Sequence, residues 1–310
     1  MINDIAFLIS TAMMYGSPLL YTALGGVMSE NSGVVNIGLE GIMSIGAFMA
    51  ALVAYYTNNP WLGFLAAAGG GMVLSLILAV SAISFRGDQT VIGTAMNFIG
   101  PGLGIFLSRK FFDGAAQTKN LIASQKLPKP FAGLFPANNP IGIILNQDIG
   151  VYISFLFVFL IWFLLYRTKY GLRIRACGEH PKAAASLGIR VKTTRYLCVL
   201  LSGCLGGLGG AMMSMAVASN YYPVLISGHG FIAMAAMIFG RWKPQGALGA
   251  CMLFGIANGL TVLLGSKDWV QINGSILAML PYILTLAVLI FTSKNSAAPA
   301  ADGVPLEESD

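Results

Sequence analysis

The sequence predicts an all-α integral membrane protein, a polytopic bundle of about nine transmembrane helices, with eight or ten as the limits. Of its 310 residues, 56% are hydrophobic and only 10% are charged, whereas charged residues make up about a quarter of a typical soluble chain. The mean hydropathy is +0.75. These values exclude a soluble enzyme, a DNA-binding protein and a secreted disulfide-rich domain.

Apolar runs of about 20 residues, the length that crosses a bilayer, recur along the chain. They lie at about 5–28, 34–56, 61–85, 90–108, 149–166, 196–218, 222–240, 245–264 and 273–292. The run at 222–240 is the weakest, because Pro223, Gly228 and Gly230 interrupt it and the remainder is too short to cross alone. We expect a broken or re-entrant helix there, packed against protein. Residues 1–292 then form a single transmembrane domain, and the first helix stays in the mature protein because no basic segment precedes it.

The distribution of charge predicts the orientation of the chain. Lys and Arg number 18 and Asp and Glu 12, and we interpret this excess as topogenic rather than as a nucleic-acid surface. Eight basic residues fall between Arg167 and Arg195, so the loop 167–195 is expected in the cytoplasm. Alternation from this loop places the N-terminus and the segment 109–148 outside and the tail 293–310 inside. The polar tail is expected to be disordered.

Polar side chains within the predicted spans mark a candidate translocation path. Asn36 and Glu40 stand four residues apart, which would place them on one face of a helix, and Asn97 and Asn258 lie in later spans. Buried polar groups are costly in a membrane and usually face a bundle interior or a cavity. Hydrogen bonding to a neighbouring helix explains them equally well at this stage.

The sequence offers no set of residues for catalysis or for metal binding. Its two histidines fall in predicted loops, no paired carboxylates lie within spans, and its four cysteines lack ligand spacing. We therefore expect no catalytic residue, no metal and no disulfide. The segment 178–190 instead predicts a short cytoplasmic helix, with a proline near its start and a glycine at its end. Such a helix would be ordered by docking into a partner's groove, although a basic stretch that holds lipid headgroups is the alternative.

Four stretches carry a resemblance to a known family. They are Ser32–Gly41, Arg173–Ile189, Arg195–Leu197 running into Ser202-Gly203, and Gly230–Ala247. In these stretches the chain resembles the membrane permease subunits of ATP-binding-cassette importers of the branched-chain amino acid, ribose and nucleoside group. The second and fourth stretches are typical of the nucleoside and simple-sugar branch, although His180 stands where Asn is common.

The resemblance implies a function, partners and a docking segment. The short helix would be a coupling helix that meets an ATPase subunit through Pro181, Ala183, Ala184, Leu187, Gly188 and Ile189. The implied assembly has two cytosolic ATPase subunits, a second permease and an external substrate-binding protein that contacts the loops near 109–148 and 219–230, all at the cytoplasmic (inner) membrane of a prokaryote. No phosphate-binding loop motif occurs in this sequence, so ATP is expected on the partner and no cofactor on this chain.

The cargo stays open between a nucleoside, which the resemblance favours, a simple sugar such as ribose, and a heterocycle such as riboflavin. Two rivals from other classes also remain. A secondary transporter or channel would work without ATP, and an intramembrane enzyme would turn over substrate by itself.

Overall fold

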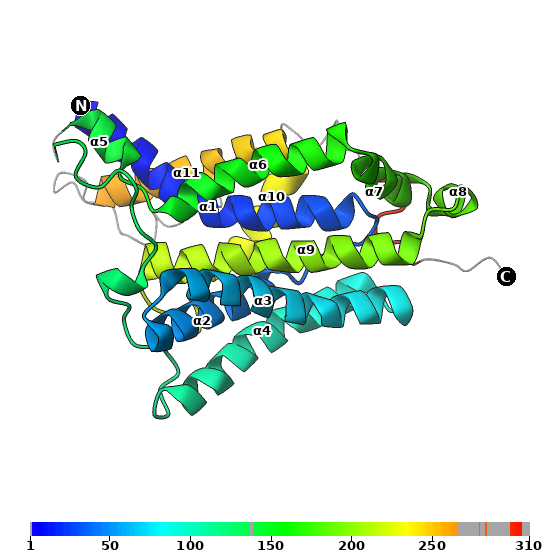
Figure 1. The fold of residues 1–310 in the computed structure, drawn as a ribbon, viewed down its shortest axis with the longest axis horizontal. Coiled ribbons are helices and arrows are strands. Elements are labelled where there is room, and N and C mark those ends of the chain that lie inside the picture. Colours follow the sequence, from blue (N-terminus) through cyan, green and yellow to red (C-terminus); the bar gives the residue numbers. More distant parts are fainter. Residues whose placement is uncertain (1, 137–138, 266–278, 280–282, 284–297, 306–310) are drawn as a thin grey trace.

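The structure, a computed structural model, describes residues 2–136, 139–265 and 298–305, together with Met279 and Ile283. All regular secondary structure among these residues is helical. The longest helices run roughly along the long axis of the molecule (Figure 1). The all-α class predicted from composition is therefore confirmed for this part of the chain.

Seven helices in the described ranges are long and apolar enough to cross a membrane. They are α1 (Ile2–Glu30), α2 (Leu39–Thr57), α3 (Pro60–Ala79) with its π-helical extension η1 (Val80–Ser84), α4 (Gln89–Phe111), α6 (Ile149–Arg167), α9 (Val191–Met212) with its π-helical extension η3 (Met213–Ala218), and α11 (Pro244–Gly265). Each overlaps a predicted span. The predicted span at 273–292 falls almost wholly outside the described residues, so the total of about nine remains a prediction.

Helix α9 lies at the centre of the bundle and packs against α1, α2 and α3. Its contact with α3 is a contact between backbones. A Cβ on Gly207 would stand 2.1 Å from the carbonyl oxygen of Ala67, and a Cβ on Gly71 would stand 2.1 Å from that of Gly203. Small residues permit this approach in lipid, where the hydrophobic effect does not drive helices together.

Helix α10 (His229–Phe239) has 11 residues and is about 16 Å long, roughly half the hydrocarbon thickness of a bilayer. The ten residues that precede it, 219–228, form no α-helix. The break predicted within 222–240 is therefore present. Helix α10 packs on α1, α2 and α11. In the irregular approach to it, Tyr221, Leu225 and Ile226 are buried, whereas Val224 is 69% exposed.

The connecting segments gather at two opposite ends of the molecule (Figure 1). Between α4 and α6 the chain forms the 3₁₀ turn η2 (Ala123–Gln125) and the short helix α5 (Pro140–Leu145). The other end carries α7 (Lys169–Glu179) and α8 (Pro181–Ser186). The predicted bounds 178–190 of the short helix are wrong. The helical conformation is interrupted at His180 (φ −141°, ψ 77°), so that α7 ends at Glu179 and α8 covers only Pro181–Ser186. The residue before a proline disfavours the helical conformation.

The C-terminal segment 298–305 contacts the same end as α7, although its composition predicts disorder. The Ala301 amide donates to the carbonyl of Gly178 at 2.8 Å. Arg195, which is 1% exposed, donates from Nε to the Ser32 carbonyl at 3.1 Å and from Nη1 to the Val304 carbonyl at 3.2 Å. Buried hydrogen bonds of this kind offset the entropy that the segment loses, so the expectation of disorder fails for these residues.

Candidate functional site

Glu40 in the first turn of α2 binds the N-terminus of α10. Its Oε1 accepts the backbone N–H of Gly228 and its Oε2 accepts that of Gly230, both at 2.7 Å. The first N–H groups of a helix lack intrahelical partners and carry a partial positive charge. A carboxylate satisfies both needs, so the buried end of this half-length helix is stabilised by a side chain from another helix.

Gly230 must be a glycine for this contact to form. A Cβ at this position would lie 2.5 Å from the Cα of Glu40 and 2.6 Å from its backbone nitrogen. Gly228 has φ +93°, a conformation that other residues rarely adopt. The Gly-His-Gly sequence thus lets the chain turn and lets α10 approach α2 closely.

Asn97 of α4 forms hydrogen bonds with backbone groups where the non-helical stretch leads into α2. Its Oδ1 accepts the N–H of Gly41 and its Nδ2 donates to the carbonyl of Ile37, each at 3.0 Å. Gly100 lies one turn further along α4, and a Cβ there would stand 2.2 Å from the carbonyl oxygen of Gly41. One amide therefore completes the hydrogen bonding of an irregular stretch that packs directly on α4.

Asn36 lies in the non-helical stretch before α2, not on the helix. Its Nδ2 donates to Ser202 Oγ of α9 at 2.9 Å, and its side chain is fully buried. Its Oδ1 accepts no hydrogen bond from the described residues. The expectation that Asn36 and Glu40 share one helical face is wrong, because α2 begins at Leu39.

These contacts place Asn36, Glu40 and Asn97 around the start of α2. Ser202 marks their depth, since it stands 11 residues after the first residue of α9, about 16 Å along the helix. That distance is about half of a 30 Å hydrocarbon core. Three of the four predicted path residues are therefore brought together near the middle of the bundle.

Asn258 is not brought to this cluster. Its Nδ2 donates to the Phe254 carbonyl of its own helix at 3.1 Å. Helix α11 packs mainly on α1, α10 and α6. Of the four candidates, this one has the geometry of a structural polar residue.

The sequence offers Tyr221 and Phe48 among several aromatic residues that could stack on a ligand, with an ordinary structural role favoured, and gives no signal for Ser202. Tyr221 and Phe48 are fully buried, with their rings edge to face at 5.5 Å, whereas tyrosines in membrane proteins commonly lie at the interfaces. Tyr221 immediately precedes the interrupted run 222–240. That interruption was the signal that could have placed Tyr221 inside the protein.

The proposed docking segment lies at the opposite end from α5, on α8 and the residues after it (Figure 1). Leu187 is 81% exposed, whereas Ala184 is buried against Cys177 and Val191 of its own chain. Ala184 therefore faces inward and not toward a partner. Pro181 and Ile189 are partly exposed, and Ala183 and Gly188 are exposed.

A Schellman motif ends α8. The Ile189 N–H donates to the Ala184 carbonyl at 3.1 Å and the Gly188 N–H to the Ala185 carbonyl at 2.9 Å. Gly188 has the φ of +80° that this motif requires. The motif turns the chain into α9 and leaves Leu187 projecting from the surface.

Comparison with known proteins places the chain in a family. Residues 8–293 match the family model for the permease component of the branched-chain amino acid transport system. The chain is 42% identical to the guanosine ABC transporter permease protein NupQ of Bacillus subtilis, over 98% of this chain and 97% of that protein. It is 38% identical to the nucleoside ABC transporter permease protein NupC of Lactococcus lactis, over the same shares. It is 30% identical to the putative glucose ABC transporter permease protein TsgC13 of Haloferax volcanii, over 96% of each chain.

The family match includes all the described membrane-crossing helices, with α1 included from residue 8. The alignments to the three permeases cover at least 96% of each of those proteins. The chain is therefore a multi-pass protein of a prokaryotic inner membrane and a transport subunit rather than an enzyme. It belongs to the family of ABC transporter permeases described by the branched-chain amino acid transport system permease component.

Proposed function

We propose that this protein is the permease subunit of an ATP-driven nucleoside importer. The observation that carries the proposal is the 42% and 38% identity to guanosine and nucleoside permeases over 98% of the chain. The identity to the putative glucose permease is lower, at 30%. A simple sugar is therefore the second candidate.

The translocation path runs past the start of α2. Transporters commonly bind solutes near the midplane, where discontinuous helices meet, and α2 and α10 both begin there. The Asn36 Oδ1 has no partner among the described residues and is buried in this structure, so it would accept a hydrogen bond from an uncharged polar solute when the bundle opens around the start of α2. The side chains of Glu40 and Asn97 form hydrogen bonds with backbone groups. They position the first turns of α2 and α10.

Two separate cytosolic subunits that dock on α8 hydrolyse the ATP. Leu187 is the side chain that would enter the ATPase groove, flanked by Pro181, Ala183, Gly188 and Ile189. Closure of the ATPases would move α8 and, through it, the helices packed behind it, which shifts the bundle between outward-open and inward-open states. A second permease completes the pathway, and an external binding protein delivers the nucleoside to the end that carries α5.

Uptake of labelled guanosine tests the cargo. Cells that express the partner subunits are compared with and without this chain, and unlabelled guanosine, ribose, glucose and riboflavin serve as competitors. We expect ATP-dependent uptake that requires the chain and that only the nucleoside blocks. Block by glucose or ribose would transfer the assignment to sugars, and block by riboflavin would transfer it to that heterocycle.

A further inference from the structure

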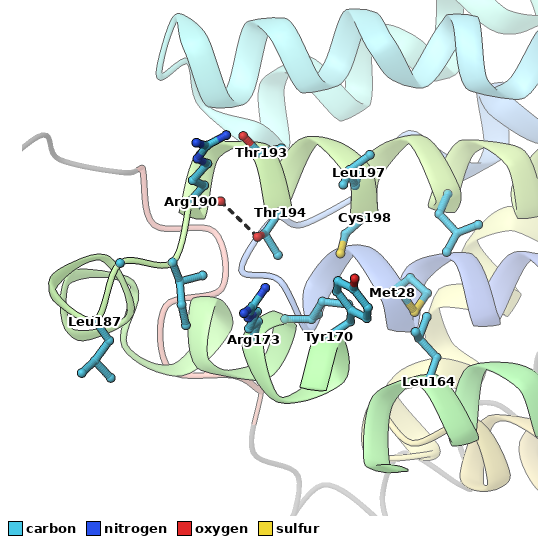
Figure 2. A pocket seen from close by; sticks show the side chains of 14 residues that line it. Met28, Leu164, Tyr170, Arg173, Leu187, Arg190, Thr193, Thr194, Leu197 and Cys198 are labelled. Carbon is cyan, nitrogen blue, oxygen red and sulfur yellow. Dashed lines mark hydrogen bonds between the residues drawn. The ribbon is translucent and has the colours of Figure 1, made fainter. Parts of the chain in front are cut away.

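A cavity of about 470 Å³ opens at the end of the molecule that carries α7 and α8, between the last turns of α1 and α6, helix α7, and the first turns of α9. Asn36, Glu40, Asn97 and Ser202, which surround the start of α2, are not among its lining residues. Figure 2 shows its side chains converging from α1, α6, α7 and α9. Its volume is within the range of sites that hold small molecules.

The lining of the cavity divides into an apolar and a polar half. Met28, Leu164, Leu197 and Leu201 belong to the membrane-crossing helices α1, α6 and α9, and Arg173, Arg190, Thr193 and Thr194 lie toward α7 and the first residues of α9. Leu187, Gly188 and Ile189 also line the cavity on the polar side, so it adjoins the proposed docking segment. Figure 2 shows Arg190 and Thr193 at one end of the cavity and Met28 and Leu164 at the other. Lipids with an ionic headgroup and acyl chains have the same division.

The polar half is positively charged. Arg173 and Arg190 are both exposed, and no acidic side chain occurs among the described residues that line the cavity. The Arg173 guanidinium lies over the ring of Tyr170, 5.9 Å from its centroid, which orients it while leaving its N–H groups available. The Thr194 hydroxyl donates to the Arg190 carbonyl at 3.0 Å. Two guanidinium groups and the Thr193 hydroxyl are the chemistry that binds a phosphate.

The apolar half continues onto the outer surface of the bundle. Leu197 lines the cavity and is 62% exposed, on the same helix as the threonines. In the membrane this surface is covered by acyl chains. When a phospholipid binds its phosphate at the arginines, its acyl chains lie beside the leucines. Inorganic phosphate lacks these apolar contacts.

From this arrangement we infer that the cavity is a binding site for an anionic phospholipid of the cytoplasmic leaflet. The headgroup phosphate lies between Arg173 and Arg190, and an acyl chain follows Leu197 and Leu201. The lipid would join α7 to the start of α9 beside the α8 turn. The inference does not depend on which solute is carried.

Retention of lipid by the purified full-length chain tests the site. The protein is transferred into nanodiscs of phosphatidylcholine that contain a small share of cardiolipin, and bound lipid is counted by native mass spectrometry. Each basic residue near an anionic headgroup contributes about fivefold to binding. The R173Q/R190Q variant is therefore expected to retain cardiolipin about 25-fold more weakly.

The matched control is R167Q/K169Q, which removes two charges from the adjoining residues outside the cavity. Its cardiolipin retention is expected to stay within about twofold of the unmodified protein. Equal losses in the two double variants would show that net charge alone holds the lipid and would overturn the site. Unchanged retention in R173Q/R190Q would overturn it as well.

A second variant, L197W, obstructs the apolar half without changing charge and guards against misfolding of the arginine variant. It is expected to lose cardiolipin and to keep a single symmetric peak in size-exclusion chromatography. Stabilisation of the unmodified protein by inorganic phosphate as strong as that by cardiolipin would identify a free phosphate as the ligand. Normal cardiolipin retention with loss of a docked ATPase in R173Q/R190Q would assign the arginines to that partner.

Discussion

The carboxylate of Glu40 accepts the backbone N–H of Gly230 at 2.7 Å, and this bond joins the start of α2 to the start of α10. Glu40 and Gly228 are half-buried and Gly230 is buried, so the carboxylate, rather than bulk water alone, pairs the end of α10. The same carboxylate also accepts the N–H of Gly228. One side chain thus satisfies two donors and holds together the two helix starts that we place on the translocation path.

Replacement of Glu40 by Gln tests this link. Glutamine keeps one acceptor oxygen but brings an NH₂ group against a backbone donor, so one N–H loses its partner and the charge at the helix end is lost. We expect uptake to fall by about tenfold or more and the free energy of unfolding to fall by roughly 1–3 kcal/mol. Thermal denaturation in detergent and uptake measure the two effects.

The control is Asp113→Asn, a carboxylate just past the end of α4 with φ +51°, a conformation that Asn tolerates well. It should leave both quantities unchanged. Full uptake and full stability in Glu40→Gln would show that this hydrogen-bonded link has no role in transport or in folding.

The close approach at Gly230 gives a steric test. In Gly230→Ala the added Cβ would lie 2.5 Å from the Cα of Glu40, which forces α10 away from α2 and costs about 1–3 kcal/mol. Gly249→Ala is the matched control, because a Cβ at Gly249 in α11 meets no atom within 4 Å. We expect reduced thermal stability and uptake only in the first variant, and equal behaviour of the two would contradict the packing.

Leu187→Asp tests the docking of the ATPase. The side chain is 81% exposed, so the change should alter the stability of the isolated permease by no more than about 0.5 kcal/mol. A carboxylate in an apolar groove of the partner is poorly solvated, and we expect co-purification of the ATPase to fall at least about tenfold.

The equivalent change at Leu172 of α7, which is 63% exposed, controls for added charge on the same face. Leu172→Asp should retain the ATPase. Retention of the ATPase by Leu187→Asp would remove α8 from the docking surface.

The contact of the C-terminal segment depends on pH through Asp302. Burial raises the pKa of its carboxyl from 3.8 to about 7, against the lowering effects of a hydrogen bond with Glu30 and of the Arg195 charge. Because the docked segment holds this proton more tightly than the free segment, docking is most stable below about pH 4 and weakens as the pH rises through about 7.

Hydrogen exchange of the Ala301 amide, which donates to the Gly178 carbonyl, measures this docking. The protection factor, corrected for the intrinsic rate, should fall between pH 6 and pH 8. In Asp302→Asn, which stays neutral, it should vary less with pH. Protection that rises with pH would contradict the assignment.

Sequence patterns located the membrane-crossing helices because each is an apolar run with clear ends. They also located the interruption at Pro223 and Gly228 that produces the half-length helix α10. They misplaced Asn36 on a helical face. The chain before Leu39 is non-helical because it is held by two side chains, Asn97 and Ser202, which lie on helices far along the sequence. Composition likewise predicted a disordered tail, since it carries no information about the buried guanidinium of Arg195.

Reconstitution of the purified permease with its ATPase subunits, and with a second permease and binding protein where these are required, tests the central claim most directly. Labelled guanosine uptake into proteoliposomes is measured with ATP, with a non-hydrolysable ATP analogue, and with the ATPase omitted. We expect uptake only when hydrolysable ATP and the ATPase are both present. Guanosine uptake by this chain alone, driven by the solute or an ion gradient, would contradict it and would identify a secondary transporter or channel.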